Sequence, residues 1–300
     1  MSRTGEPGAD FFKAEMQCEF LVDEKRKKIW AVELEMLKKV DEVCRKYGLT
    51  YWAFYGTMLG AVRHHGFVPW DDDIDLAMFR DDYEKFQAVA PQEFTEPYFF
   101  QNSYTDRIVW PFSKIRDSRT TGIEFRDLKD VNQGIFIDIF PLDSVPDKAR
   151  AETDDMFRTQ RLLWNMVTNP RDVLLEVKQD LLEGKRTIQD IQSLLDISKK
   201  DIKERFRIFE DANRVRFGGT EEVNYIMGAF GGSNTMKMEW FKDTMYLPFE
   251  YMEIPVPVEY DKILIRRYGD YHKFVRGGST HQNIILEPDI PYEEYFEKYL

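Results

Sequence analysis

The sequence predicts an α/β protein of the α+β kind, in which a core of strands and flanking helices is interrupted by a helical insertion. Strand and helix patterns alternate up to about residue 146, helical spacing alone fills residues 150–217, and strand patterns return before a last helix near the C-terminus. We therefore expect a core domain over residues 24–146, a helical insertion or subdomain over 147–219, and a segment over 220–300 that completes the core.

Composition narrows the class of protein. The 300 residues are 43% hydrophobic and 32% charged, which fits one large globular domain or one domain with an insertion. A net charge of −12 argues against nucleic-acid binding, because phosphate backbones attract surplus Lys and Arg. The sequence has no transmembrane run of about 18 apolar residues and no apolar signal-peptide core, so we predict a cytoplasmic protein.

The elements of the core follow from periodicity and from Gly and Pro. A first helix runs from Glu24, with apolar residues at spacings of three or four, until Gly48 ends it. A short aromatic strand follows at 51–55. Thr57 is predicted to N-cap a helix from about Met58 to His64.

Further elements follow the break at Gly66 and Pro69. We expect a strand at 74–78, a helix from Arg80 that Pro91 stops, and strands and loops over 98–115. A strand at 134–143 precedes the helical middle, and strand-like residues 245–258 lead to a last helix at 260–268 with Gly269 as its C-cap. The tail reads as loop.

Asp73 and Asp75 are the first residues that indicate chemistry. They are one residue apart on a predicted strand, so both carboxylates point to the same side. Two such charges repel unless a cation lies between them, and Mg²⁺ prefers carboxylate oxygens. The alternatives are a solvated acidic turn, or a calcium loop starting at Asp71. Leu76 and Asp82 occupy positions where that loop needs Gly and prefers Glu.

Gly56 and Thr57 form a predicted phosphate site. A strand that ends there and opens a helix presents free backbone N–H groups and the positive end of the helix dipole. The alternative is an ordinary turn with a capped helix. The aspartate pair on the next strand would place a metal beside this turn.

A third carboxylate comes from Asp138. It shares a strand face with Phe136 and Phe140 in the apolar run GIFIDIFPLD, where a charge is costly unless it is paired or binds metal. The alternative is an edge strand with Asp138 facing water.

Basic residues are needed to hold an anionic substrate. Lys114 and Arg116 would share one strand face, and Arg63 lies at the end of the helix before the aspartate strand. The alternative for each of the three is a surface charge.

The order of these parts resembles a known fold. A Gly-Thr turn, a helix, Asp-x-Asp and a later strand aspartate are the pattern of the nucleotidyltransferase fold of DNA polymerase beta-like enzymes. More specifically, the chain resembles the LicD family of phosphocholine transferases, which is similar to the fukutin-type phosphoribitol transferases. The resemblance spans roughly residues 30–145 and 245–275 and rests on YGTMLGAVRHHGFVPWDDDIDL, GIFIDIFPLD and YDKILIRRYGDY.

The resemblance implies a nucleotidyltransferase-like mixed sheet and an activity. A substituted phosphate would move from a CDP-activated donor, typically CDP-choline, to a hydroxyl of a cell-surface glycan such as teichoic acid, capsule or lipopolysaccharide. Asp73 and Asp75 would hold Mg²⁺ or Mn²⁺, with Asp138 as third ligand or general base. Asp71 and Asp72 would support the loop. Such a protein would lie in the cytoplasm or at the inner face of the membrane, with peripheral membrane contact.

Two other functions are compatible with the same residues. One is a nucleotidyltransferase that transfers NMP to a small molecule or protein, and the other is a non-catalytic binding module with this fold. A choline headgroup would need an aromatic cage formed through cation–π contacts. The candidates for it are Trp52, Tyr55, Trp70, Trp110 and Trp240.

Overall fold

The chain divides into two units, each with its own core. The computed structural model describes residues 5–145, 150–214, 221–225, 235–277 and 283–300. The first unit combines Met1–Pro141 with Glu239–Leu300, and the second comprises Leu142–Met238. The predicted domain boundaries at 146/147 and 219/220 lie outside the described residues and stay predictions.

A sheet forms the centre of the first unit. Its strands are in the order β3, β4, β8, β6, β5. β8 is antiparallel to β6, with Asp138 opposite Lys114, and the Asp138 N–H donates to the Ile74 carbonyl beside β4 (2.8 Å). Their bounds are β3 Trp52–Ala53, β4 Asp75–Phe79, β5 Tyr98–Gln101, β6 Ser113–Asp117 and β8 Ile135–Val145.

Three helices of the first unit belong to the N-terminal half of the chain: α1 (Glu24–Tyr47), α2 (Tyr55–Arg63) and α3 (Arg80–Glu93). α1 buries an apolar face that includes Trp30, whose ring stacks on Phe67 with centroids 4.6 Å apart. Its Asp23 N-cap accepts from the Arg26 N–H, and Gly48 ends it at a φ of +64°. A left-handed residue at this position is the usual end of a helix, so sequence and structure agree.

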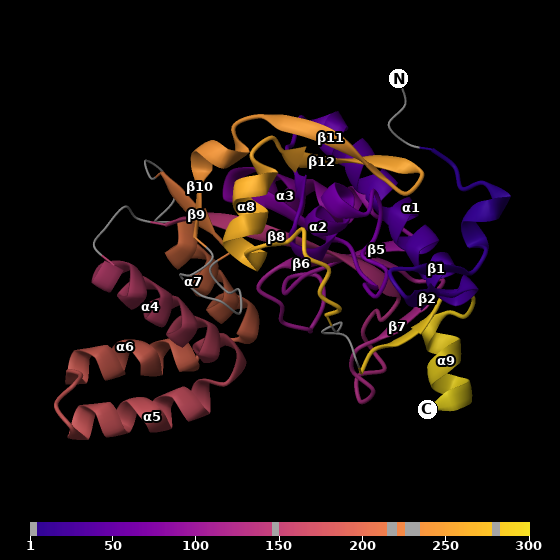
Figure 1. The fold of residues 1–300 in the computed structure, drawn as a ribbon. Helices are drawn as coiled ribbons and strands as arrows, with labels where there is room; N and C mark the ends of the chain where they lie inside the picture. The colour runs from indigo at the N-terminus through magenta and orange to yellow at the C-terminus, as the bar shows by residue number, and fades with distance from the viewer. Residues whose placement is uncertain (1–4, 146–149, 215–220, 226–234, 278–282) are drawn as a thin grey trace. The chain divides into compact units, whose positions relative to one another are not determined.

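The C-terminal segment returns to the same unit and packs against α2 and β3. The hairpin of β11 (Thr244–Phe249) and β12 (Met252–Pro257) and the helix α8 (Tyr260–Tyr268) lie beside elements made 200 residues earlier (Figure 1). Shorter elements complete the unit: η1 Ala9–Phe12, β1 Glu15–Gln17, β2 Phe20–Val22, β7 Thr121–Ile123, β13 Ile285–Glu287 and α9 Tyr292–Tyr299.

The second unit is mainly helical. Its helices are α4 (Arg150–Thr168), α5 (Pro170–Leu182), α6 (Ile188–Ser198) and α7 (Ile202–Arg214). An apolar cluster of Met166, Val173, Val177 and Leu194 forms its core. β9 (Glu222–Asn224) pairs with the end of β8 and with β10 (Met236–Lys237), before η3 (Met238–Phe241).

The predicted fold class, α+β with a mixed sheet, flanking helices and a helical middle, is confirmed. Two local predictions are wrong. α3 passes through Pro91 and ends at Glu93, since a proline in the last turn removes only one helical hydrogen bond. The tail predicted as loop contains β13 and α9. The N-terminal residues, for which no element was predicted, form β1 and β2.

Candidate active site

α2 begins at Tyr55, three residues before the predicted start. Phe54 is the N-cap, and its carbonyl accepts from the Met58 N–H (3.1 Å). Thr57 is therefore not an N-cap. Its hydroxyl is buried within the helix and accepts from the Asp75 N–H (2.8 Å), which joins α2 to β4. The first turn of a helix leaves its N–H groups without helical partners, so the predicted phosphate site keeps its donors.

An acidic cluster lies beside this turn. Ligand oxygens of Asp71, Asp72 and Asp73 all lie within 4.8 Å of one another. A Cβ on Gly56 would overlap the Asp71 Oδ2, so only glycine allows this approach. Two side chains of α1 hold the backbone at Asp71 in place, because the Asp71 carbonyl accepts from Arg26 Nη1 (2.7 Å) and Trp30 Nε1 (3.1 Å).

The charges of the cluster act on the pKa values of Asp75 and Asp138. Burial raises the pKa of Asp75 well above its usual range, and Asp73, Asp138 and Asp71 raise it further. Burial also raises the pKa of Asp138 to about 6, against the attraction of Lys114. Asp138 is 5% exposed on a strand between β4 and β6, so the edge-strand alternative is wrong.

The predicted ligand set is only partly brought together. Asp73 joins Asp71 and Asp72 in the close cluster, whereas Asp75 and Asp138 lie outside it. Asp71 and Asp72, expected to support the loop, thus offer oxygens at the position predicted for metal.

The cluster has the chemistry of a divalent-cation site. Glu33 on α1 adds a fully buried carboxyl group, neither oxygen of which has a hydrogen-bond partner among the described residues. Burial raises the pKa of Glu33 well above its usual range, followed by the charges of Asp73, Asp72 and Asp71. Sequence reasoning missed Glu33, because it lies on the apolar side of a long helix. Such an excess of carboxylates fits Mg²⁺ or Mn²⁺.

Lys114 and Arg116 share one side of β6, as predicted, but their side chains contact different groups. Lys114 Nζ lies 2.9 Å from Asp138 Oδ1, 3.4 Å from Glu124 Oε1 and 3.4 Å from the ring centroid of Phe136. Lys114 is therefore part of the acidic site.

Arg116 is fully buried and its guanidinium is engaged. It donates to Gln101 Oε1 (2.6 Å), to the Gly134 carbonyl (2.9 Å) and to Glu124 Oε2. Because its guanidinium is already bonded to these three groups, Arg116 supports the sheet.

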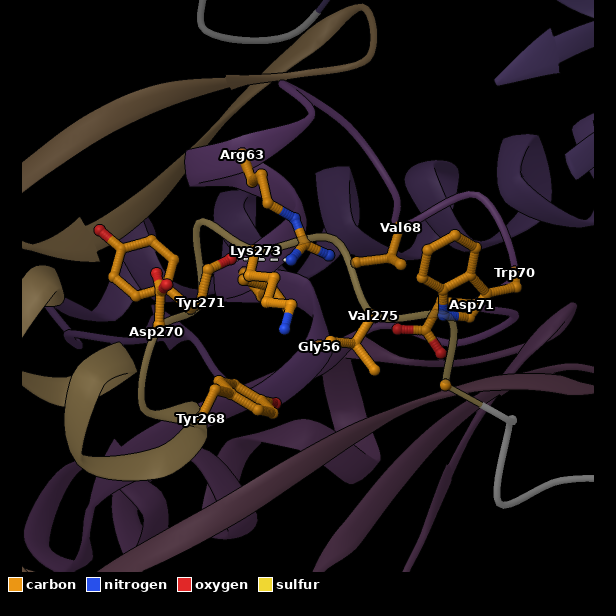
Figure 2. A pocket seen from close by; sticks show the side chains of 12 residues that line it. Gly56, Arg63, Val68, Trp70, Asp71, Tyr268, Asp270, Tyr271, Lys273 and Val275 are labelled. Carbon is orange, nitrogen blue, oxygen red and sulfur yellow. Dashed lines mark hydrogen bonds between the residues drawn. The ribbon is translucent and has the colours of Figure 1, made fainter. Parts of the chain in front are cut away.

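Arg63 lines a cavity of about 390 Å³ next to the acidic cluster (Figure 2). We call this cavity the α2 pocket. It is lined by Gly56, Leu59, Arg63, Val68, Trp70, Asp71, Tyr268, Asp270, Tyr271, Lys273, Val275 and Gly277. Tyr268 is the last residue of α8, and five of the twelve residues come from the chain after it, which the sequence predicted as loop. The segment YDKILIRRYGDY, part of the family resemblance, had indicated the region up to Tyr271 but not Lys273, Val275 and Gly277.

Tyr268 and Arg267 connect the pocket to the acids. Burial raises the pKa of Tyr268 to about 12; the neighbouring Arg267 lowers it, and the charges of Asp75 and Asp71 raise it. The Arg267 guanidinium lies 4.6 Å from the ring centroid of Tyr55.

The first turn of α2, the acidic cluster and the strand aspartate Asp138 are the parts predicted for a nucleotidyltransferase-type site, and all of them lie in the first unit. Residues 48–174 match the family model described as LicD/FKTN/FKRP, nucleotidyltransferase domain. The resemblance to the LicD family that the sequence predicted is thus confirmed, and with it the class of enzyme, a LicD-type transferase.

Particular relatives extend this match. The lipopolysaccharide cholinephosphotransferase LicD of Haemophilus influenzae is 28% identical over 248 residues, covering 80% of this chain and 88% of that protein. The mouse ribitol-5-phosphate transferase FKTN is 29% identical over 102 residues, covering 34% of this chain and 20% of that protein. The human ribitol 5-phosphate transferase FKRP is 40% identical over 59 residues, covering 20% of this chain and 12% of that protein.

No helix in the described part of the chain is both long enough and apolar enough to cross a membrane. The predicted cytoplasmic location stays a prediction.

Proposed function

We propose that the protein is a metal-dependent phosphotransferase that moves a substituted phosphate, phosphocholine or a similar group, from a CDP-activated donor to a hydroxyl of a cell-surface glycan. The observation that carries the proposal is the acidic cluster beside the first turn of α2, within a LicD-type domain. The similarity to the lipopolysaccharide cholinephosphotransferase over 80% of the chain supports the substrate class.

Asp71, Asp72 and Asp73 would hold the metal, with Asp75 and Asp138 near them. A divalent cation held there would neutralise the negative charge that develops on the leaving nucleotide. The chain's own residues position the reactants. N–H groups in the first turn of α2 point at a phosphate placed next to Gly56, where the helix dipole favours an anion.

Asp138 is our candidate general base. A carboxyl with a pKa of about 6 is mostly ionised at neutral pH and still basic enough to take a proton. The acceptor hydroxyl oxygen attacks the phosphorus of the substituted phosphate and its proton passes to Asp138. The bond from that phosphorus to the bridging oxygen breaks, and CMP leaves with the electron pair. Lys114, 2.9 Å from Asp138 Oδ1, orients the base.

CMP release tests the proposal. The purified chain is incubated with Mg²⁺, lipopolysaccharide as acceptor, and CDP-choline, CDP-ethanolamine or CDP-ribitol in turn. We expect CMP and a modified acceptor from one donor, with loss of at least a hundredfold in Asp75→Asn and about 10²–10⁴-fold in Asp138→Asn. Asp81→Asn, an exposed aspartate on α3, is the matched control and should keep full activity.

Two outcomes would contradict the proposal. Pyrophosphate release from CTP or ATP with a nucleotidylated product would identify an NMP transferase. Unchanged glycan modification in cells that carry Asp75→Ala would leave a binding module without turnover at this site.

A further inference from the structure

The α2 pocket extends well beyond the acidic cluster. Gly56, Leu59 and Arg63 line it from positions i, i+3 and i+7, so one face of α2 forms its wall. At 1.5 Å per residue, Arg63 lies about 10 Å along the helix axis from Gly56. One end of the pocket is therefore at the metal site proposed above, and the other end is a separate region.

Two cationic side chains, Arg63 and Lys273, line that other end. Arg63 is fixed in place, because Nη1 donates to the Tyr271 carbonyl (2.8 Å) and Nε to His64 Nε2 (3.0 Å). Its Nη2 has no hydrogen-bond partner in the described part of the chain. Lys273 is exposed and forms no ion pair with any described residue. Figure 2 shows both side chains pointing their nitrogen atoms into the same space above the Tyr268 ring.

The charges and rings of this end select a class of ligand. Arg63 and Lys273 favour an anion, since a guanidinium and an ammonium bind phosphate or carboxylate oxygens. They oppose a trimethylammonium group, which would meet two like charges. Asp270 also lines the pocket, but Figure 2 shows it beside the Tyr271 ring at the opposite side from Asp71. Tyr268 supplies a flat apolar face of the kind on which a sugar ring packs, and Figure 2 shows Trp70 beside Asp71, where it supplies a second such face at the acidic end.

The donor's phosphates occupy the metal end of the pocket, because the two phosphorus atoms of a pyrophosphate share one bridging oxygen. Arg63 is anchored about 10 Å further along α2, measured between Cα atoms. We therefore assign the anion that Arg63 and Lys273 would hold together to another part of a substrate.

We propose that the α2 pocket is the acceptor subsite for an anionic sugar, whose phosphate or carboxylate pairs with Arg63 and Lys273. Its reacting hydroxyl then points toward Gly56 and Asp71. This inference rests on the proposed function, because it takes the acidic cluster as the place of phosphoryl transfer.

Binding of three simple sugars to the full-length chain tests the inference. Glucose 6-phosphate, glucuronate and glucose are titrated separately, with ligand-observed NMR as readout, and CMP is titrated in the same way. We expect an anionic sugar to bind more tightly than glucose. Its dissociation constant should rise at least tenfold in Lys273→Gln and in Arg63→Gln, while CMP binding stays the same.

Lys262→Gln is the matched control, because Lys262 is an exposed lysine on α8 that does not line the pocket. It should bind as the unmodified chain does. If Arg63→Gln fails to fold, Lys273→Gln alone decides, since Lys273 makes no contact on which the fold depends. The tighter of the two anionic sugars identifies phosphate or carboxylate as the recognised group.

Two results would overturn the inference. Equal binding of the anionic sugar to Lys273→Gln and to the unmodified chain would remove the subsite. If Lys273→Gln weakens CMP binding and leaves sugar binding unchanged, the pocket belongs to the donor nucleotide. Because the readout is binding, a chain that shows this sugar selectivity but releases no CMP from CDP donors refutes the proposed function and leaves the sugar site standing.

Discussion

Lys114 supplies a buried positive charge that compensates the carboxylates of Asp138 and Glu124. It is 1% exposed, and its ammonium lies between Asp138 and Glu124 and against the Phe136 ring. Taking these charges out of water is costly, and their attraction and hydrogen bonds offset that cost only when all partners are present. Removing Lys114 leaves two buried carboxylates without its ammonium.

We expect Lys114→Met to lower the free energy of unfolding by about 3–5 kcal/mol, the usual result of breaking a buried ion pair. Denaturant titration followed by circular dichroism measures it. Glu124 keeps its ion pair with Arg116, so Asp138 is the carboxylate that is stranded, and adding Asp138→Asn to Lys114→Met should recover part of the loss. A loss below about 1 kcal/mol, typical of exposed pairs, would contradict the burial of this cation.

At the scale of elements, the site depends on how α2 is joined to β4. The hydroxyl of Thr57, inside α2, accepts from the backbone N–H of Asp75, the first residue of β4. One side chain thus fixes the distance between the helix whose first turn faces the substrate and the strand that carries the acids.

Thr57→Val tests this connection with little change of shape. It leaves the Asp75 N–H without its acceptor and should cost about 1–3 kcal/mol of stability. Thr57→Ser keeps the hydroxyl and serves as control. Thermal unfolding of the two variants should separate them by several degrees, and equal melting temperatures would show that the hydrogen bond contributes nothing.

Local signals predicted the helix ends better than the helix starts. Gly48 and Gly269 follow α1 and α8 as predicted, because a glycine adopts the positive φ that ends a helix. The start of α2 was misread, since Thr57 has the side chain of an N-cap but uses it on β4. Sequence spacing cannot show which backbone group a hydroxyl will reach.

The acidic half of the site was predictable and the pocket was not. Asp73 and Asp75 are neighbours in sequence, and Asp138 is marked by the apolar strand around it. Tyr268 and Lys273 reach the same place only because α8 packs against α2. Tertiary packing of this kind leaves no periodic trace in the sequence.

At the scale of the whole molecule, the first unit gathers an excess of negative charge at one place. Burial, and then the charges of Asp73, Asp72 and Asp71, raise the pKa of Glu33. Burial, and then the charges of Asp73, Asp138 and Asp71, raise the pKa of Asp75. Like charges held together destabilise a fold, so a bound cation should stabilise it.

We expect Mg²⁺ to raise the melting temperature of the full-length chain. At a hundred times its dissociation constant, a ligand of the folded state adds about 2.7 kcal/mol. Differential scanning calorimetry with Mg²⁺, Mn²⁺ or a chelator measures the shift. Asp73→Asn should abolish it and Asp81→Asn should keep it. Equal melting temperatures with metal and with chelator would remove the cation site.

The first unit is built from two stretches of chain, Met1–Pro141 and Glu239–Leu300, and this order has a consequence for biosynthesis. A ribosome that has made the first 238 residues has already produced every aspartate of the acidic cluster. The wall formed by Tyr268, Tyr271 and Lys273 does not yet exist. The α2 pocket is therefore completed only after Gly277 has been made, so a chain that stops before this residue cannot present the whole proposed acceptor subsite to a glycan.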